Sequence, residues 1–183
     1  PDMGADETNS GQAVFCSGTP ATSVINGAGS VCTGSGTTLT SSSGEYGITY
    51  AWFSGITPGG PYPTALGTAP TQVTGNLTVP AYYICITTCA SSGLSFTTPE
   101  KSVMINALPT VVVNPASSSY CSPGGTAVAL TAGGANAYAW SPATGLSATT
   151  GATVSASPAS STIYTVTGTD ANGCVNTATA SVS

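Results

Sequence analysis

Apolar and polar residues alternate along most of this chain in short runs, and glycine, proline, serine and threonine interrupt the runs every few residues. Alternation with a period of two is typical of strands that bury one face, and no stretch keeps the 3.6-residue period of an amphipathic helix. Clear examples are the runs Ser102–Ile105 and Thr177–Ser183. The pattern therefore predicts an all-β protein.

The same series of strands occurs twice. Each copy has a cysteine, a strand centred on leucine, a strand with Tyr-Ala-Trp in its middle, and a strand that contains tyrosine, with a further cysteine within or after it. In the first copy these are Cys32, Leu39, Trp52, Tyr83 and Cys85, and in the second they are Cys121, Leu130, Trp140, Tyr164 and Cys174. A repeat period of roughly ninety residues predicts two tandem domains.

The tryptophans are expected in the domain cores. Trp52 and Trp140 lie ten to thirteen residues after the leucine of the preceding strand. This spacing fits facing strands B and C of an immunoglobulin-like sandwich, in which an indole fills the space between the sheets. Tyr83 lies two residues before Cys85, which is typical of strand F in such folds. We therefore predict two tandem immunoglobulin-like β-sandwiches, with Trp52, Trp140, Tyr83 and Tyr164 in their cores.

The predicted domain boundaries follow from the positions of these strands. Residues 1–15 form a leader or an added edge strand, residues 16–106 the first domain with two disulfides, and residues 107–183 the second domain with one disulfide. Residues 106–110 are a short linker, because proline interrupts strand pairing there. So short a linker predicts a semi-rigid rod.

Charge is unusually scarce: charged residues make up 4% of the chain, against roughly 25% in ordinary soluble domains. Lys101 is the sole basic side chain, so the chain cannot form a cationic groove for phosphates, and nucleic acid binding is excluded. A net charge of −5 leaves little repulsion between copies at high concentration, which suits an anchored or assembled protein.

The inventory of side chains also argues against catalysis. The chain has no histidine and no arginine, so neither a Ser-His pair nor an arginine clamp can form. Glu45, Glu100 and Asp170 are scattered over different turns and do not make the acid pair of a glycoside hydrolase. The Asp170–Gly173 segment predicts a hairpin turn and lacks the further oxygen ligands that calcium requires. We predict no enzyme activity, no cofactor and no metal site.

Six cysteines without a C-x-x-C pair or a histidine favour disulfides over zinc and an extracellular location. Cys85 and Cys89 lie four residues apart in one predicted strand, so their Cα atoms are about 13 Å apart, whereas a disulfide spans roughly 4.4 to 6.8 Å. Each must therefore reach Cys16 or Cys32. We favour the pairs Cys16–Cys85, Cys32–Cys89 and Cys121–Cys174, and the swapped pairs Cys16–Cys89 and Cys32–Cys85 remain open.

No apolar stretch approaches the roughly 18 residues of a membrane-spanning helix, and no signal peptide is present. We therefore expect a secreted or cell-surface protein without membrane insertion. Because the chain begins at Pro1 rather than at methionine, we expect a processed product or an excised segment.

Five sequence segments resemble segments of known proteins: residues 30–34, 48–52, 82–89, 140–147 and 164–174. They resemble the immunoglobulin-like modules of secreted and cell-surface proteins of the Bacteroidota, over nearly the whole chain from Cys16 onward. The resemblance implies modules strung in tandem in adhesins, gliding-associated proteins or the non-catalytic parts of exported enzymes. It implies spacers, stalks or adhesive surfaces and supplies no catalytic motif. The resemblance also implies a C-terminal sorting domain, which is not recognisable here, so we expect either that this domain was removed or that the chain is a segment or subunit of something longer.

We therefore expect a non-catalytic, rod-like subunit or segment of a cell-surface fibre or adhesin, with copies of itself or neighbouring modules as partners. Sandwiches leave edge strands that a neighbour can complete, and the strand around Ala13, Val14 and Phe15, or the one ending at Ser183, could be donated. The alternative is a carbohydrate-binding or spacer module of a larger secreted enzyme, with surface glycans as partners. Its candidate aromatic residues are Tyr62, Phe53 and Tyr120.

Overall fold

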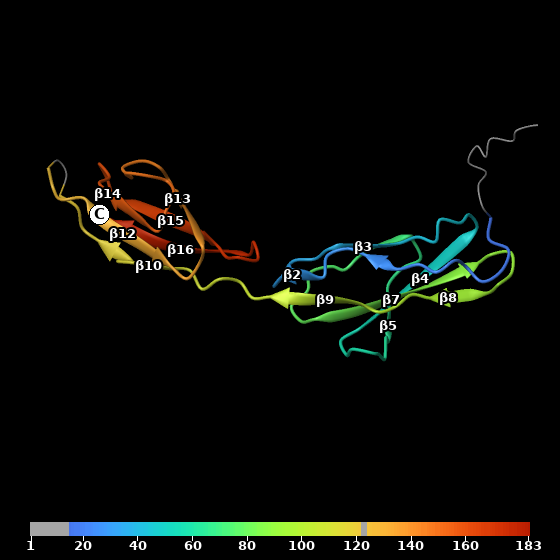
Figure 1. Ribbon diagram of the computed structural model, residues 1–183. Coiled ribbons are helices and arrows are strands. Elements are labelled where there is room, and N and C mark those ends of the chain that lie inside the picture. The colour runs from blue at the N-terminus through green and yellow to red at the C-terminus, as the bar shows by residue number, and fades with distance from the viewer. Residues whose placement is uncertain (1–14, 122–123) are drawn as a thin grey trace, which may run out of the picture. The chain divides into compact units, whose positions relative to one another are not determined.

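The computed structural model of the protein describes residues 15–121 and 124–183, and it divides into two compact units, unit 1 (Pro1–Ile105) and unit 2 (Asn106–Ser183). The division falls one residue before the predicted end of the first domain. Every helix or strand assigned in the described ranges is a strand (Figure 1), which confirms the predicted all-β fold class. No helix in these ranges is long and apolar enough to cross a membrane. Residues 1–14, most of the predicted leader, lie outside the described residues.

Unit 1 is a sandwich of two sheets. Its strands are β1 (Ile25–Asn26), β2 (Ser30–Cys32), β3 (Thr38–Ser41), β4 (Ile48–Gly55), β5 (Thr64–Ala65), β6 (Thr71–Val73), β7 (Ala81–Cys89), β8 (Ser95–Thr97) and β9 (Lys101–Asn106). One sheet has the order β1-β3-β6, and the other has the order β2-β9-β7-β4-β5, with β8 also paired to β7.

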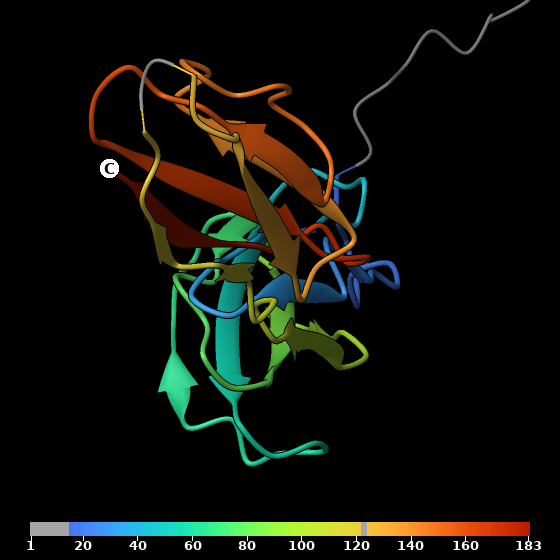
Figure 2. The ribbon, with the colours of Figure 1, turned by 90° about the vertical axis from the view of Figure 1, so that its left-hand side faces the viewer.

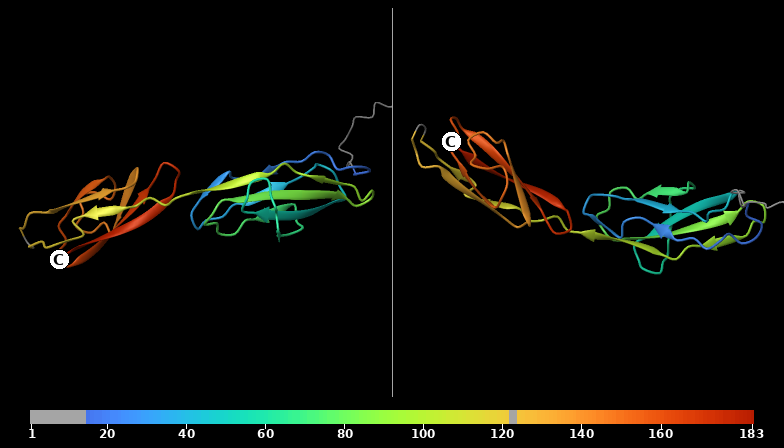
Figure 3. Two further views of the ribbon diagram at one scale, coloured as in Figure 1. Left: turned by 90° about the horizontal axis from the view of Figure 1, so that it is seen from below. Right: turned by 45° about the horizontal axis from the view of Figure 1, so that its top comes forward.

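The antiparallel pair of β4 and β7 forms the centre of the larger sheet of unit 1. Its register runs from Ile48 opposite Cys89 to Gly55 opposite Tyr82, and Figure 3 shows the two strands side by side. On its other edge β7 pairs with β8 near one end and with β9 near the other. Between them Thr98 bonds Cys85 twice, since its N–H donates to the Cys85 carbonyl and its hydroxyl accepts from the Cys85 N–H, both at 2.9 Å. β8, Thr98 and β9 therefore follow the same edge of β7 in turn, and the bonds of Thr98 fill the gap between the two strands.

Unit 2 repeats the plan of unit 1. Its strands are β10 (Val112–Asn114), β11 (Ser117–Ser118), β12 (Val128–Gly133), β13 (Ala137–Ser141), β14 (Thr153–Ala156), β15 (Thr162–Thr169) and β16 (Val175–Val182). They form the sheets β10-β12-β14 and β11-β16-β15-β13, whose two layers are visible in Figure 2. In an immunoglobulin-like sandwich, a sheet with strands A, B and E faces a sheet with strands C, F and G. The sheets β1-β3-β6 and β10-β12-β14 correspond to A, B and E, and the strands β4, β7, β9 and β13, β15, β16 correspond to C, F and G.

Alternation along the strands builds the two cores. In β7 every second residue is buried, from Ala81 to Cys89, as expected for a strand with one face against the opposing sheet. Each core is centred on one tryptophan and one tyrosine: Trp52 and Tyr83 are 1% and 3% exposed, and Trp140 and Tyr164 are 4% and 0% exposed. The four residues predicted for the cores therefore lie in them.

Candidate interaction surface

The polar atoms of the core aromatics bond to the backbone in both units. The indole Nε1 of Trp52 donates to the Ala69 carbonyl at 2.8 Å, and that of Trp140 donates to the Gly151 carbonyl at 2.9 Å. The Tyr164 hydroxyl donates to the Thr144 carbonyl at 2.7 Å. Burial raises the pKa of both Tyr83 and Tyr164. These rings are buried in the cores and hold each sandwich together.

The carboxylates of the described residues are used in the same way. Glu45 accepts from the Ala21 N–H at 2.9 Å, and Asp170 accepts from the N–H groups of Asn172 and Cys174, both at 2.8 Å. Asp170 thereby closes the turn between β15 and β16, which pair as the predicted hairpin. Among the described residues no group of three or more His, Cys, Asp or Glu could hold a metal ion. Each of these acids fixes a loop instead of forming a pair.

Tyr62, one of the aromatic residues considered for glycan binding, is tied to a third acid. Its hydroxyl donates to Glu100 at 2.5 Å, and the same carboxylate oxygen accepts from the Gly59 N–H at 2.8 Å. The hydrogen bond to Glu100 raises the pKa of the Tyr62 phenol. The loop between β4 and β5 is thus anchored to the segment before β9. Tyr120, a second such residue, is half-buried and packs against the core of unit 2.

The disulfide of unit 1 corrects the favoured pairing. Cys16 is bonded to Cys89 with a Cα–Cα distance of 5.7 Å, so the pairs Cys16–Cys85 and Cys32–Cys89 are wrong and one of the two swapped pairs is present. Cys89 ends β7, whereas Cys32 ends β2, which pairs with β9 beside the opposite end of β7. The eight residues along β7 separate these ends by about 26 Å, so Cys32 cannot reach Cys89.

Cys85 has a free thiol in the core of unit 1, which also rules out its pairing with Cys32. It is fully buried opposite Trp52, and burial raises the pKa of its thiol, while the nearby Ser41 hydroxyl opposes the rise. The Ser41 Oγ atom is itself buried and has no hydrogen-bond partner among the described residues at full hydrogen-bond distance and angle. Unit 1 therefore keeps the strand-F cysteine of an immunoglobulin-like domain and has serine on the facing strand in place of its partner.

Cys121 also has a free thiol, so the predicted pair Cys121–Cys174 is wrong. Its neighbour Tyr120 donates from its N–H to the Ser183 carbonyl, which places Cys121 beside the end of β16. Cys174 immediately precedes the start of β16. The strand between them spans about 26 Å, far beyond the reach of a disulfide.

The two free thiols should differ in reactivity. We expect a thiol reagent at neutral pH to label the exposed Cys121 and to leave Cys85 unlabelled until unit 1 unfolds, because the thiolate is the reactive form and burial disfavours it. Mass spectrometry of peptides from native and unfolded chains measures this. The pKa of Cys85 is raised above its ordinary value of 9.0, so the free energy of unfolding of unit 1 depends on the protonation of this thiol. The stability that the neutral thiol contributes is fully present below pH 9.0 and is lost as the pH rises through the pKa of the folded state. Labelling of Cys85 in the native chain at neutral pH would contradict the assignment.

The end of the predicted assembly strand lies at the surface of unit 1. Phe15 forms a parallel bridge with Tyr46, and their rings lie 5.7 Å apart at an interplanar angle of 43°. Both rings are exposed, at 70% and 59%. The next residue, Cys16, carries the disulfide, and its carbonyl accepts from the Ser91 hydroxyl at 2.7 Å. Ala13 and Val14 lie outside the described residues.

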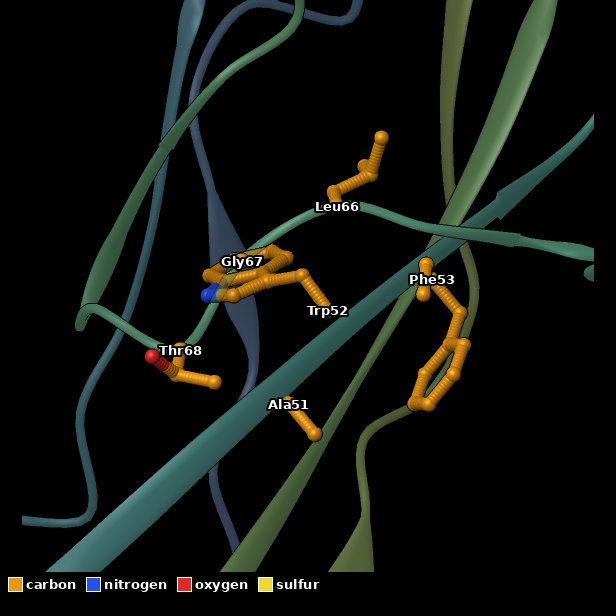
Figure 4. A pocket seen from close by; sticks show the side chains of 7 residues that line it. Ala51, Trp52, Phe53, Leu66, Gly67 and Thr68 are labelled. Atoms are coloured by element: carbon orange, nitrogen blue, oxygen red, sulfur yellow. The ribbon is translucent and has the colours of Figure 1, made fainter.

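In the middle of β4 and β7, four apolar side chains that point away from the core lie together, with Thr49, Tyr82 and Thr88 around them. We call these four the outer face of unit 1: Ala51, Phe53, Ile84 and Ile86. Phe53 lies opposite Ile84 and Ala51 opposite Ile86. Figure 4 shows Phe53 on the other side of β4 from Trp52. All four residues are only half-buried. Phe53, the third glycan-binding candidate, therefore lies on a sheet face within an aliphatic patch.

Two cavities open on unit 1. The first, of about 270 Å³, is lined by residues 51–53 and 65–68 and lies beside the outer face of unit 1 (Figure 4). The second, of about 350 Å³, is lined mainly by apolar side chains that include Ile56, Leu66, Val79 and Tyr83. Leu66 contributes to both. Neither cavity contains one of the described carboxylates, so both suit apolar groups and not ions.

Comparison with known proteins finds solved structures that are similar at low sequence identity. No protein-family model matches the chain, and no curated protein matches it. Three N-terminal domains of the outer capsid protein Hoc of bacteriophage RB49 match at a TM-score of 0.46 and 18% identity, covering 88% of this chain and 58% of that one. Fibronectin(III)-like modules of Clostridium thermocellum CbhA match at 0.40 and 10%, covering 89% and 90%. Four N-terminal Ig domains of Dscam1 match at 0.36 and 13%, covering 88% and 52%. The chain thus spans little more than half the length of the Hoc and Dscam1 structures.

Proposed function

We propose that this chain is a non-catalytic pair of modules in an extracellular, cell-surface structure, a fibre or an adhesin. The observation that supports this most directly is that the polar groups of its core aromatics and acids are engaged in hydrogen bonds within the fold. The core tryptophans, Tyr62, Tyr164 and the carboxylates of the described residues all bond to backbone or loop partners. The exposed side chains of the described residues include many hydroxyl and aliphatic groups and the rings of Phe15 and Tyr46, which suits a structural or binding module.

An extracellular setting accounts for the chemistry of the cysteines. A disulfide that closes a loop across a sequence separation of 73 residues persists in oxidising compartments and is rare in a reducing cytosol. The proposal includes an origin in the Bacteroidota and a role in an adhesin or a gliding-associated protein. The five sequence segments that resemble such modules support both.

Immunogold electron microscopy of intact source cells, with an antibody raised against the chain, tests the proposed location and role. We expect label on unpermeabilised cells, arranged along filaments or other surface structures. Label that appears only after permeabilisation would overturn the proposal. Cleavage of the antigen by protease added to whole cells provides an independent measure of exposure.

We also propose that copies assemble by strand addition through the leader. Phe15 and Cys16 are held at the end of unit 1 by the bridge to Tyr46 and by the disulfide, so the chain before them starts from a fixed point. Extended segments add to exposed sheet edges by main-chain hydrogen bonds. Deletion of residues 1–15 should abolish polymers seen by negative-stain microscopy, whereas deletion of residues 1–10 keeps the strand around Ala13 and should preserve them. Equal polymers from both deletions would count against leader donation.

A further inference from the structure

The two units can be compared position by position because both are built on the same register. Trp52 lies opposite Cys85, and Trp140 lies opposite Val166. One residue further, Phe53 opposite Ile84 in unit 1 corresponds to Ser141 opposite Thr165 in unit 2. One residue earlier, Ala51 opposite Ile86 corresponds to Ala139 opposite Thr167. Three of the four outward positions are therefore large and apolar in unit 1 and hydroxylic in unit 2.

This difference cannot be a requirement of the fold. The core positions of the two units match, with leucine, tryptophan and tyrosine in both, whereas the outward positions do not. A sheet face that meets water normally carries polar residues, and unit 2 shows that this sandwich accepts them. The four side chains of the outer face are partly exposed and adjoin one another, and contiguous apolar surface on a soluble domain often marks an interaction site.

The chemistry around the outer face of unit 1 limits what can cover it. Its rim carries the hydroxyl groups of Thr49, Thr88, Thr97 and Ser102, which lie on the same side of the sheet. Such a rim has no formal charge, so it offers nothing to nucleic acid, to an anionic membrane or to a charged protein. Hydroxyl groups both donate and accept hydrogen bonds, so a second identical face satisfies the rim as well as the apolar centre.

We propose that the outer face of unit 1 docks on the same face of a second copy of this chain. The inference names the partner of the proposed structural role and rests on that role for its biological setting. Two sheets pack face to face about 10 Å apart with interdigitating side chains, and a twofold axis makes one patch serve both copies. The cavity of about 270 Å³ beside Phe53 and Leu66 gives a protruding side chain of the partner a place to insert.

The size of the face sets the strength of the contact. The central strands β4 and β7 have eight and nine residues and are about 26 to 30 Å long, and four strands span about 15 Å. Because the outer strands are shorter, each copy buries at most roughly 400 Å², or roughly 800 Å² in total, below the range of stable complexes. A single contact is therefore weak. It becomes effective where copies are held in arrays, since tethering supplies effective concentrations near the millimolar range.

Sedimentation velocity tests this contact in the chain without residues 1–15, which cannot donate the leader, and in a Cys121→Ser background that prevents disulfide dimers through the exposed thiol. We expect the weight-average sedimentation coefficient to rise towards that of a dimer between roughly 10 μM and roughly 1 mM, as for a weak interface. The double variant Ile84→Thr/Ile86→Thr, which gives unit 1 the residues of unit 2, should weaken association at least tenfold. Phe53→Ser, which matches Ser141, tests the same face if the double variant does not fold.

The matched control is Ile163→Thr. Ile163 is 65% exposed and lies on the outward side of β15 in unit 2, so its loss removes an exposed isoleucine from the corresponding strand without touching the outer face of unit 1. This variant should associate as the parent does. A parent that stays monomeric over the whole range, or a double variant that associates unchanged, overturns the proposed docking. Immunogold label on intact cells would then still support the surface role, so the two proposals fail separately.

Discussion

Replacement of Cys16 by serine is expected to lower the free energy of unfolding of unit 1 by about 2 to 5 kcal/mol, the range for loss of a native disulfide. The crosslink joins residues 73 apart in sequence, so it removes a large share of the conformational freedom of the unfolded chain. It also fixes the first described residues to the end of β7, where the Ser91 hydroxyl and the Cys16 carbonyl add a hydrogen bond. The variant loses both the constraint and the anchor.

Urea unfolding followed by tryptophan fluorescence measures the effect of Cys16→Ser in one unit at a time. Each core contains one tryptophan, so a Trp140→Phe background leaves Trp52 as the reporter of unit 1. The urea midpoint of unit 1 should fall in Cys16→Ser and in Cys89→Ser by similar amounts. Cys121→Ser, which removes an exposed free thiol, is the matched control and should leave the midpoint unchanged. A midpoint in Cys16→Ser equal to that of the parent would show that Cys16 and Cys89 are not joined in solution.

The sequence predicted those features that depend on local pattern. Alternation placed the strands, and the spacing of Trp52 and Trp140 from the preceding leucine identified two sandwiches of the same type. Asp170 and its glycine-ended turn predicted the hairpin between β15 and β16. These features follow from the two-residue period of a strand and from the chemistry of turns, which act over a few residues.

The pairing of the cysteines could not be predicted, because it depends on which end of a strand each one occupies. The repeat aligned Cys32 with Cys121, but β2 lies beside β9 at the opposite end of β7 from Cys89. The direction of each strand and the order in which the strands pair determine these distances between cysteines, and neither can be predicted from a few neighbouring residues. The assumption that all six cysteines form bonds within their own domain also failed, because Cys85 and Cys121 carry free thiols.

The outer face of unit 1 has a signal in the sequence that is separate from the pattern of the core residues. Alternation shows that Phe53, Ile84 and Ile86 point away from the core once Trp52 and Tyr83 point into it. Alignment of the two copies then sets them against Ser141, Thr165 and Thr167. The tie between Tyr62 and Glu100, by contrast, joins residues 38 apart and had no local signal at all.

Trp140→Ala is the substitution with the largest expected effect on unit 2. The indole fills the space between the sheets and is 4% exposed, and removal of a buried tryptophan costs about 3 to 5 kcal/mol through lost burial and the remaining cavity. The change also leaves the Gly151 carbonyl without the indole N–H that donates to it at 2.9 Å. Since a domain of this kind is stable by only about 5 to 15 kcal/mol, this loss removes a large share of the stability of unit 2, and we expect its unfolding to move to much lower urea.

The single tryptophan that remains in the Trp140→Ala variant separates the two units. Trp52 should report an unchanged urea midpoint for unit 1, while far-ultraviolet circular dichroism shows an early transition from unit 2. Trp140→Phe keeps a ring in the core and loses chiefly the indole hydrogen bond, so its cost should be nearer to about 1 kcal/mol. If the Trp52 midpoint falls in Trp140→Ala, the two sandwiches stabilise one another and do not behave as independent modules. If Trp140→Ala costs no more than Trp140→Phe, the space between the sheets of unit 2 collapses readily, and the indole is not the element that fixes their separation.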